Sequence, residues 1–329
     1  MGWEAMRRIV VGGSIALVCG SAFVAAADLG APGPYGWASF EDEIVDAARE
    51  RTVSVLVVYP VPAEDVEPPR PGFPLIAFHH GFLLRGSLYR SYGERLASHG
   101  FVVVLPTYAM SLSSANHTEL ALDARLVIDY GLGLDRETGS PLFGRIDETA
   151  VGAAGHSFGG KLSLLEAAAD PRVRAIAALD PVDGGGPGPA DPVLFPSVTP
   201  ERMGEITAPL LLVGAELGGV NWFLIPCAPP GENYQRFFET ASSPAIEVTQ
   251  RGAGHGQYVD PGAEFLLSAC APGTAEAGRV RSDATAYLTA FFLGHLGTDA
   301  TALEWLDARL ADDEAHGLIS VRRTESGGT

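Results

Sequence analysis

A serine-centred motif with a defined context constrains this chain more than any other feature. Residues 155–159 read Gly-His-Ser-Phe-Gly. The preceding run, residues 149–155, is apolar and strand-like, and the following run, residues 161–169, is rich in leucine and alanine and helix-like. The bare pattern is weak in a chain with 40 glycines. Between a strand and a helix, however, it is typical of a sharp turn that presents a serine hydroxyl, so Ser157 is the predicted nucleophile.

Apolar runs alternate along the chain from about residue 50 onward in a way that indicates the fold class. Strands are expected at residues 52–59, 75–79, 101–105, 149–155, 173–179, 209–213 and 245–249, and helices at 87–99, 120–130, 161–169 and 283–296. Apolar strands that alternate with helices are typical of a mostly parallel sheet covered on both faces. We therefore expect an α/β fold with its ligand chemistry at the carboxyl ends of the strands.

The first 27 residues have the organisation of a signal peptide. Arg7 and Arg8 precede an apolar run, and small residues at 25–27 suit cleavage before Asp28. An uncleaved anchor is the alternative. We expect a signal peptide at 1–27, one domain at 28–298 and an acidic, then polar, tail at 299–329. No later segment is long and apolar enough to span a bilayer, so the expected product is secreted, either extracellular or periplasmic, without stable membrane insertion.

Charge and cysteine content narrow the partners and the compartment. The formal net charge of −18 argues against nucleic acid and anionic membrane surfaces as partners. After signal removal the cysteines are Cys227 and Cys270, and two cysteines in an exported chain favour one disulfide. The sequence contains no phosphate-binding glycine loop, zinc-type spacing or calcium loop, so we expect no cofactor and no metal.

A serine nucleophile needs a base within hydrogen-bond reach and a carboxylate that orients that base. The order along the chain in this architecture is serine, acid and histidine. Two histidines follow Ser157, namely His255 and His295. His255 lies in a glycine-rich loop directly after the strand at 245–249 and is the predicted base. His295 lies near the end of a helix, where a surface or capping role is expected.

The acid has three candidates. Asp180 follows the strand at 173–179 and is the favoured one. Glu216 follows the next strand, at 209–213, and is the alternative because it would also face the carboxyl edge of the sheet. Asp183 is a third option, but its glycine-rich surroundings suit a turn.

Ester cleavage also needs donors aimed at the developing oxyanion. The backbone N–H of Phe158, directly after the nucleophile, is one expected donor. The loop that begins at His80 offers the N–H of Phe82 as the second, with the Phe82 ring lining an acyl pocket. His79 and His80 precede Ser157 in the chain, an order this fold rarely uses for the base, so we expect them to be structural.

Several segments together resemble chlorophyllases. They are residues 80–89 with 97–101, 155–161, 179–184 and 226–238. The resemblance spans roughly residues 50–260 and implies an α/β-hydrolase fold that cleaves carboxylic esters without a cofactor. It also implies that Ser157 is the nucleophile, Asp180 the acid and His255 the base.

The chain departs from this family and its neighbours at identifiable positions. Phe158 stands where plant chlorophyllases usually carry arginine, which makes the expected pocket wall more apolar. Bacterial cutinases and polyester hydrolases share the core, but their acid follows the strand matching 209–213, where this chain has Gly218. Their cleft tryptophan is also absent near residues 180–182. Both departures favour Asp180 over Glu216.

The predicted function is therefore a secreted serine esterase that acts on a small-molecule or lipid-like ester with an apolar part. A cutinase, polyester hydrolase or lipase-type esterase is the alternative with the same chemistry. An exported binding protein that keeps the fold without turnover is the alternative from a different class.

Overall fold

The computed structural model describes residues 10–12, 28–64, 68–111, 115–184, 191–223, 226–263, 267–297, 299 and 301–324. Within the predicted signal peptide the described residues are strand β1 (Val10–Gly12), which pairs antiparallel with β2 (Gly36–Asp46). The rest of that predicted segment, and residues 325–329 of the predicted tail, lie outside the described residues.

The described strands form one ten-stranded sheet in the order β1-β2-β3-β5-β4-β6-β7-β8-β9-β10. The run from β5 through β4, β6, β7 and β8 to β9 is parallel, and β2, β3 and β10 join it antiparallel. The strands are β3 (Arg51–Val61), β4 (Phe73–His79), β5 (Val102–Thr107), β6 (Ile146–His156), β7 (Val173–Leu179), β8 (Leu210–Ala215), β9 (Ala245–Gln250) and β10 (Ile319–Arg323).

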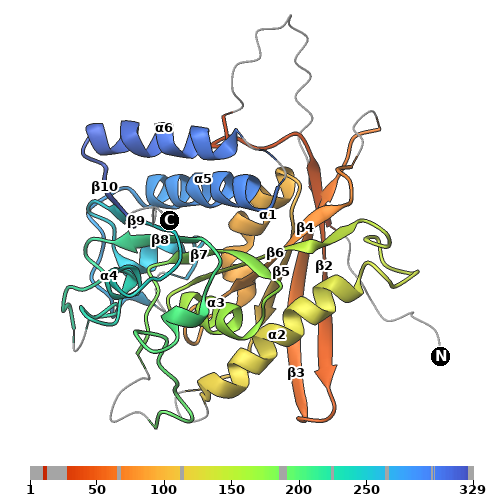
Figure 1. Cartoon of the computed structure of the whole chain (residues 1–329), viewed down its shortest axis with the longest axis horizontal. Helices are drawn as coiled ribbons and strands as arrows, with labels where there is room; N and C mark the ends of the chain where they lie inside the picture. The colour runs from red at the N-terminus through yellow and green to blue at the C-terminus, as the bar shows by residue number, and fades with distance from the viewer. Residues whose placement is uncertain are drawn as a thin grey trace, which may run out of the picture.

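Helices cover both faces of the sheet, as Figure 1 shows. One face carries α1 (Arg90–Ser98), α5 (Ala277–His295) and α6 (Ala302–Ala315), and the other carries α2 (His117–Gly133), α3 (Phe158–Ala169) and α4 (Tyr234–Glu239). Each face has its own apolar cluster, so the central strands are buried on both sides; every residue of β4 and β8 is buried. The predicted α/β-hydrolase architecture, a mostly parallel sheet between two helical layers, is confirmed.

The fold continues past residue 298, where the sequence predicts a tail. Helix α6 buries Leu306 and Leu310 against the cluster that contains α5, and β10 pairs antiparallel with β9. The acidic residues of α6 that give the segment its tail-like composition lie mostly on its solvent face. Apolar positions four residues apart are what dock such a helix.

A disulfide joins Cys227 and Cys270, whose Cα atoms lie 5.4 Å apart. It connects the loop after β8 to the segment that follows the short 3₁₀ helix η3 (His255–Tyr258). The closed loop spans 43 residues, and such a cross-link stabilises a fold by about 3–4 kcal/mol.

Among the described residues, no helix combines the length and apolar character needed to span a membrane.

Candidate active site

Ser157 occupies the turn between β6 and α3 with a backbone conformation that few residues tolerate. Its φ is 57° and its ψ is −122°. In the described chain four non-glycine residues have positive φ, and three of them, Leu83, Ser157 and Asp180, lie in loops at the carboxyl ends of β4, β6 and β7. Non-glycine residues in this region carry strain, which concentrates at functional sites.

The glycines around Ser157 are required by close backbone approach. A Cβ at Gly159 would overlap the carbonyl oxygen of His79, and a Cβ at Gly155 would overlap the backbone of Gly159. The turn therefore packs directly against the end of β4. This is why the two outer glycines of the motif fold as a tight strand-to-helix turn and leave the Ser157 hydroxyl at the sheet edge.

Three predicted side chains form one hydrogen-bonded chain. The Oγ of Ser157 lies 2.9 Å from Nε2 of His255, and Nδ1 of His255 lies 2.7 Å from Oδ2 of Asp180. The other carboxylate oxygen of Asp180 accepts from the N–H of Ala215 at 3.2 Å. Asp180 and His255 are buried, whereas Ser157 is partly exposed. A carboxylate only accepts, so Nδ1 of His255 carries the proton and Nε2 is left to accept from the serine hydroxyl.

The two other candidate acids have different partners. The carboxylate of Glu216 accepts from the N–H of Gly252 at 2.7 Å and from Nη1 of Arg251 at 2.8 Å. These two contacts, led by the Gly252 hydrogen bond, lower the pKa of Glu216. Asp183 is buried, and its carboxylate accepts hydrogen bonds from the loop that contains Val198 and Thr199 instead. The structure thus places Asp180, and neither Glu216 nor Asp183, against His255.

Gly218 lies against the carboxylate that faces His255. A Cβ built on Gly218 would fall 2.5 Å from Oδ2 of Asp180. The loop after β8 therefore reaches the same point in space as the loop after β7. A carboxylate from either loop could orient the histidine, and this chain provides it from β7.

One predicted oxyanion donor, Phe158, directly follows the serine, and the other, Phe82, lies in the loop after β4. Within the described part of the chain, no acceptor is found for the N–H of Phe82 or Phe158. The two rings meet edge to face, with centroids 6.3 Å apart. His117 packs on Phe158 at 4.4 Å and on Phe195 at 4.9 Å. Phe82, Phe158, His117 and Phe195 therefore form a contiguous set of aromatic rings.

A buried ion pair joins the helix after Ser157 to the loop after β7, and the sequence analysis did not assign it. Lys161, on the first turn of α3, is fully buried; its Nζ donates to the carbonyl oxygen of Asp183 at 2.6 Å and lies 3.5 Å from the Asp183 carboxylate. That carboxylate also accepts from the N–H groups of Val198 and Thr199. Burial lowers the pKa of Lys161, and Asp183 opposes that shift. The pair therefore fixes the loop after β7 to the helix that follows Ser157.

The remaining predicted histidines have structural partners. Nδ1 of His79 lies 2.7 Å from the Tyr108 hydroxyl, and its Nε2 lies 3.0 Å from Glu166. His80 accepts from the N–H of Tyr108 through Nε2 and donates to the Gly81 carbonyl through Nδ1. His295 lines a pocket elsewhere.

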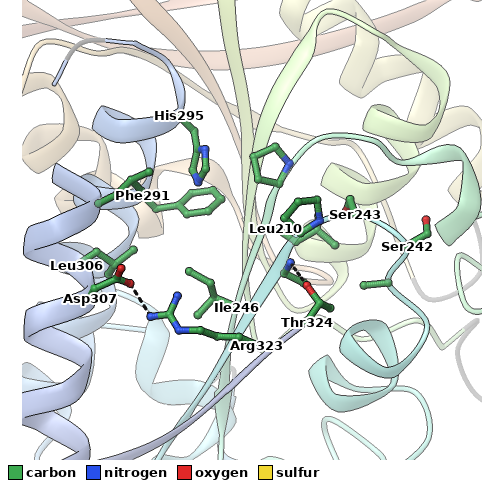
Figure 2. A pocket seen from close by; sticks show the side chains of 15 residues that line it. Leu210, Ser242, Ser243, Ile246, Phe291, His295, Leu306, Asp307, Arg323 and Thr324 are labelled. Atoms are coloured by element: carbon green, nitrogen blue, oxygen red, sulfur yellow. Dashed lines mark hydrogen bonds and ion pairs between the residues drawn. The ribbon is translucent and has the colours of Figure 1, made fainter. Parts of the chain in front are cut away.

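That pocket, of about 520 Å³, lies at the amino ends of β8 and β9, between these strands and α5, α6 and β10 (Figure 2). Phe291 and His295 lie on one side of it, and an ion pair of 2.6 Å between Asp307 and Arg323 closes another (Figure 2). Ser157 and its partners lie at the opposite, carboxyl ends of the strands. None of the predicted catalytic residues lines this pocket.

Comparison with known proteins places the chain in a family. The chlorophyllase family model matches residues 33–311. The chain belongs to the chlorophyllase family. Its relatives include Chlorophyllase-2 of Arabidopsis thaliana, 27% identical over 57% of this chain and 61% of that protein. Chloroplastic Chlorophyllase-1 of Citrus unshiu is 30% identical over 61% of this chain and 60% of that protein.

A bacterial protein is also similar to this member of the chlorophyllase family. Cutinase est1 of Thermobifida alba is 28% identical over 51% of this chain and 48% of its own length. The chain thus spans less than two thirds of each of these three relatives. The predicted resemblance to chlorophyllases, with cutinases as neighbours, is confirmed.

Proposed function

We propose that this protein is a serine carboxylic ester hydrolase that works through an acyl-enzyme. The hydrogen-bonded chain from Ser157 through His255 to Asp180 carries the proposal. Membership of the chlorophyllase family, with relatives named chlorophyllases and cutinases, supports it. A nucleophile on a strained turn, a base and an orienting acid are what acyl transfer requires.

In the proposed mechanism His255 takes the proton of Ser157 while the hydroxyl attacks the ester carbonyl. The N–H groups of Phe82 and Phe158 hold the oxyanion that forms. His255 then gives its proton to the leaving alcohol, and water hydrolyses the acyl-enzyme by the same steps in reverse roles. Asp180 keeps the imidazole in the required tautomer and stabilises its cation. No step needs a cofactor.

The wall of the site supports an ester with an apolar part as the substrate class. The rings of Phe82, Phe158 and Phe195 form a contiguous aromatic set through His117, and burial lowers the pKa of His117 to about 3 and keeps it uncharged. A neutral, aromatic surface favours apolar acyl or alcohol groups. We also propose that the protein is exported, because a disulfide between Cys227 and Cys270 suits an oxidising compartment.

Hydrolysis of p-nitrophenyl esters from acetate to palmitate tests the proposal. Wild-type protein is expected to turn over at least part of this series, with the acyl length of highest kcat/KM reporting the depth of the pocket. Ser157→Ala is expected to lower kcat by about 10⁶-fold, the scale seen when a serine nucleophile is removed. Equal rates for the two proteins would refute the esterase proposal and favour a binding protein on a hydrolase fold.

A further inference from the structure

A chain of buried hydrogen bonds runs beneath the site and has no part in the mechanism above. The N–H of Gly81 donates to the hydroxyl of Tyr89 at 3.1 Å. That hydroxyl lies 2.7 Å from Nδ1 of His156, whose Nε2 lies 3.0 Å from the carbonyl oxygen of His255. Tyr89 and His156 are both fully buried.

Chemistry fixes the direction of every bond in this chain. A carbonyl oxygen only accepts, so Nε2 of His156 carries a proton and donates to His255. In the neutral ring Nδ1 is then the acceptor, and the Tyr89 hydroxyl donates to it. The hydroxyl oxygen is left to accept from Gly81. Each group has one role, and no alternative arrangement of protons satisfies all three contacts with a neutral imidazole.

Burial keeps both members in the protonation states that this arrangement needs. Burial, and next the charge of the neighbouring His255, lower the pKa of His156 well below the ordinary histidine value. Burial likewise raises the pKa of Tyr89 far above that of an ordinary tyrosine. The ring of His156 therefore stays neutral and Tyr89 stays a hydroxyl over the range in which the enzyme is expected to work.

The two ends of this series of hydrogen bonds lie beside a proposed oxyanion donor and at the proposed base. Gly81 directly precedes Phe82, whose N–H is a proposed oxyanion donor, and His255 is the proposed base. The fit at the first end is close, because a Cβ on Gly81 would lie 3.2 Å from the Tyr89 oxygen and 3.3 Å from Nδ1 of His156. His156 also packs against His255, with ring centroids 4.7 Å apart.

We infer that Tyr89 and His156 are positioning residues. They hold the loop that carries Gly81 and Phe82 at a fixed distance from the loop that carries His255. The inference rests on the proposed esterase function. The oxyanion donor and the base act on the same tetrahedral intermediate, so an error in their separation weakens binding of that intermediate more than binding of the substrate. A misplacement of about 1 Å can cost 10²-fold in rate.

Tyr89→Phe removes the hydroxyl and keeps the ring, and α1 offers a matched control. Tyr89 ends the 3₁₀ turn directly before α1, and Tyr92 lies in the first turn of α1 and is equally buried. The Tyr92 hydroxyl has no hydrogen-bond partner within the described part of the chain. We expect Tyr89→Phe to lower kcat on a p-nitrophenyl ester by about 10–100-fold with KM within about twofold. The inhibition constant of butylboronic acid, which forms a tetrahedral adduct on the serine, should weaken in parallel with kcat. Tyr92→Phe should leave all three values unchanged.

His156 gives a second test that does not depend on how well Tyr89→Phe folds. Glutamine carries both a donor and an acceptor, so His156→Gln can bridge Tyr89 and His255, whereas His156→Leu cannot. We expect His156→Gln to retain most of the kcat and His156→Leu to lose it together with boronate affinity. Each assay is run below the melting temperature of the variant, measured by thermal unfolding.

The outcomes separate this inference from the proposed function. If wild type hydrolyses the ester, Ser157→Ala does not, and Tyr89→Phe matches Tyr92→Phe in kcat and boronate affinity, the positioning role is refuted and the esterase stands. Equal kcat for His156→Gln and His156→Leu would refute it too. If wild type and Ser157→Ala do not differ, the esterase proposal itself fails.

Discussion

Asp180→Asn is expected to lower kcat for ester hydrolysis by about 10⁴-fold, with the fold intact. Asp180 accepts the proton of His255 Nδ1 at 2.7 Å. An asparagine amide can donate at this position, which would favour the imidazole tautomer that cannot take a proton from Ser157. Steady-state kinetics of purified variants on one p-nitrophenyl ester measure the effect. Glu216→Gln is the matched control and should stay within about twofold of wild type, because Glu216 bonds Arg251 and Gly252 instead.

A loss of activity in Glu216→Gln, with Asp180→Asn unaffected, would contradict this assignment. Gly218 provides a stricter version of the test. Because its Cβ would fall beside the Asp180 carboxylate, Asp180→Ala combined with Gly218→Asp should recover part of the kcat that Asp180→Ala alone loses. Recovery would show that the carboxylate matters and the strand that carries it does not.

Stability is expected to fall steeply as the pH is lowered from 6.5 toward 4. Burial lowers the pKa of His80 to about 4 and that of His117 to about 3, and it lowers the pKa of His156 well below its usual value. In the unfolded chain each titrates near pH 6.5. Between pH 6.5 and the lower folded-state values, the unfolded state binds protons that the folded state does not bind. Each histidine therefore removes about 1.4 kcal/mol of stability per pH unit, or about 4 kcal/mol per pH unit for these three together.

Urea unfolding at pH 7.5, 6.5, 5.5 and 4.5 measures this slope directly. Partners lower the pKa of Asp46, Asp170, Glu216 and Glu276, so these carboxylates keep their contributions above their unfolded pKa of about 4 and lose them as the pH falls below it. The slope between pH 6.5 and about 5.5 therefore reports the histidines. His117→Phe tests the cause, because the buried Nδ1 of His117 has no hydrogen-bond partner among the described residues. This variant should lose the part of the slope that one histidine contributes, about 1.4 kcal/mol per pH unit. A free energy of unfolding that is constant from pH 6.5 to 4.5 would refute the account.

The strands that position the site could be predicted because they are buried on both faces. The apolar runs at residues 173–179 and 245–249 match β7 (Val173–Leu179) and β9 (Ala245–Gln250) to within one residue. Chain order along a parallel sheet then brings the residues after them to one edge. This is why Ser157, Asp180 and His255 could be singled out before their contacts were known.

The elements that the sequence analysis missed carry mixed signals. Strand β2 contains four acidic residues, a composition typical of a loop, yet it pairs with β3 along its whole length. Helix α6 contains two buried leucines, but the acidic residues around them dominate its composition. Antiparallel edge elements expose one face, so their composition resembles that of a surface segment.

The supporting contacts of the site could not be predicted, because each joins residues far apart in sequence. His156 stands inside the serine motif, but its partners Tyr89 and His255 are 67 and 99 residues away. Lys161 contacts Asp183 because α3 packs antiparallel to β7, which brings the start of the helix to the end of the strand. The sequence favoured Asp180 over Glu216, but the contact of Asp180 with His255, 75 residues away, is visible only in the fold.

Labelling with a fluorophosphonate, mapped by mass spectrometry of the digested protein, tests the central claim most directly. An unactivated serine reacts negligibly, whereas a serine held against a base forms a covalent adduct. The account predicts a single adduct on Ser157 at neutral pH, lost in Ser157→Ala and strongly slowed in His255→Ala. An unlabelled wild-type protein, or an adduct on a different serine, would contradict it.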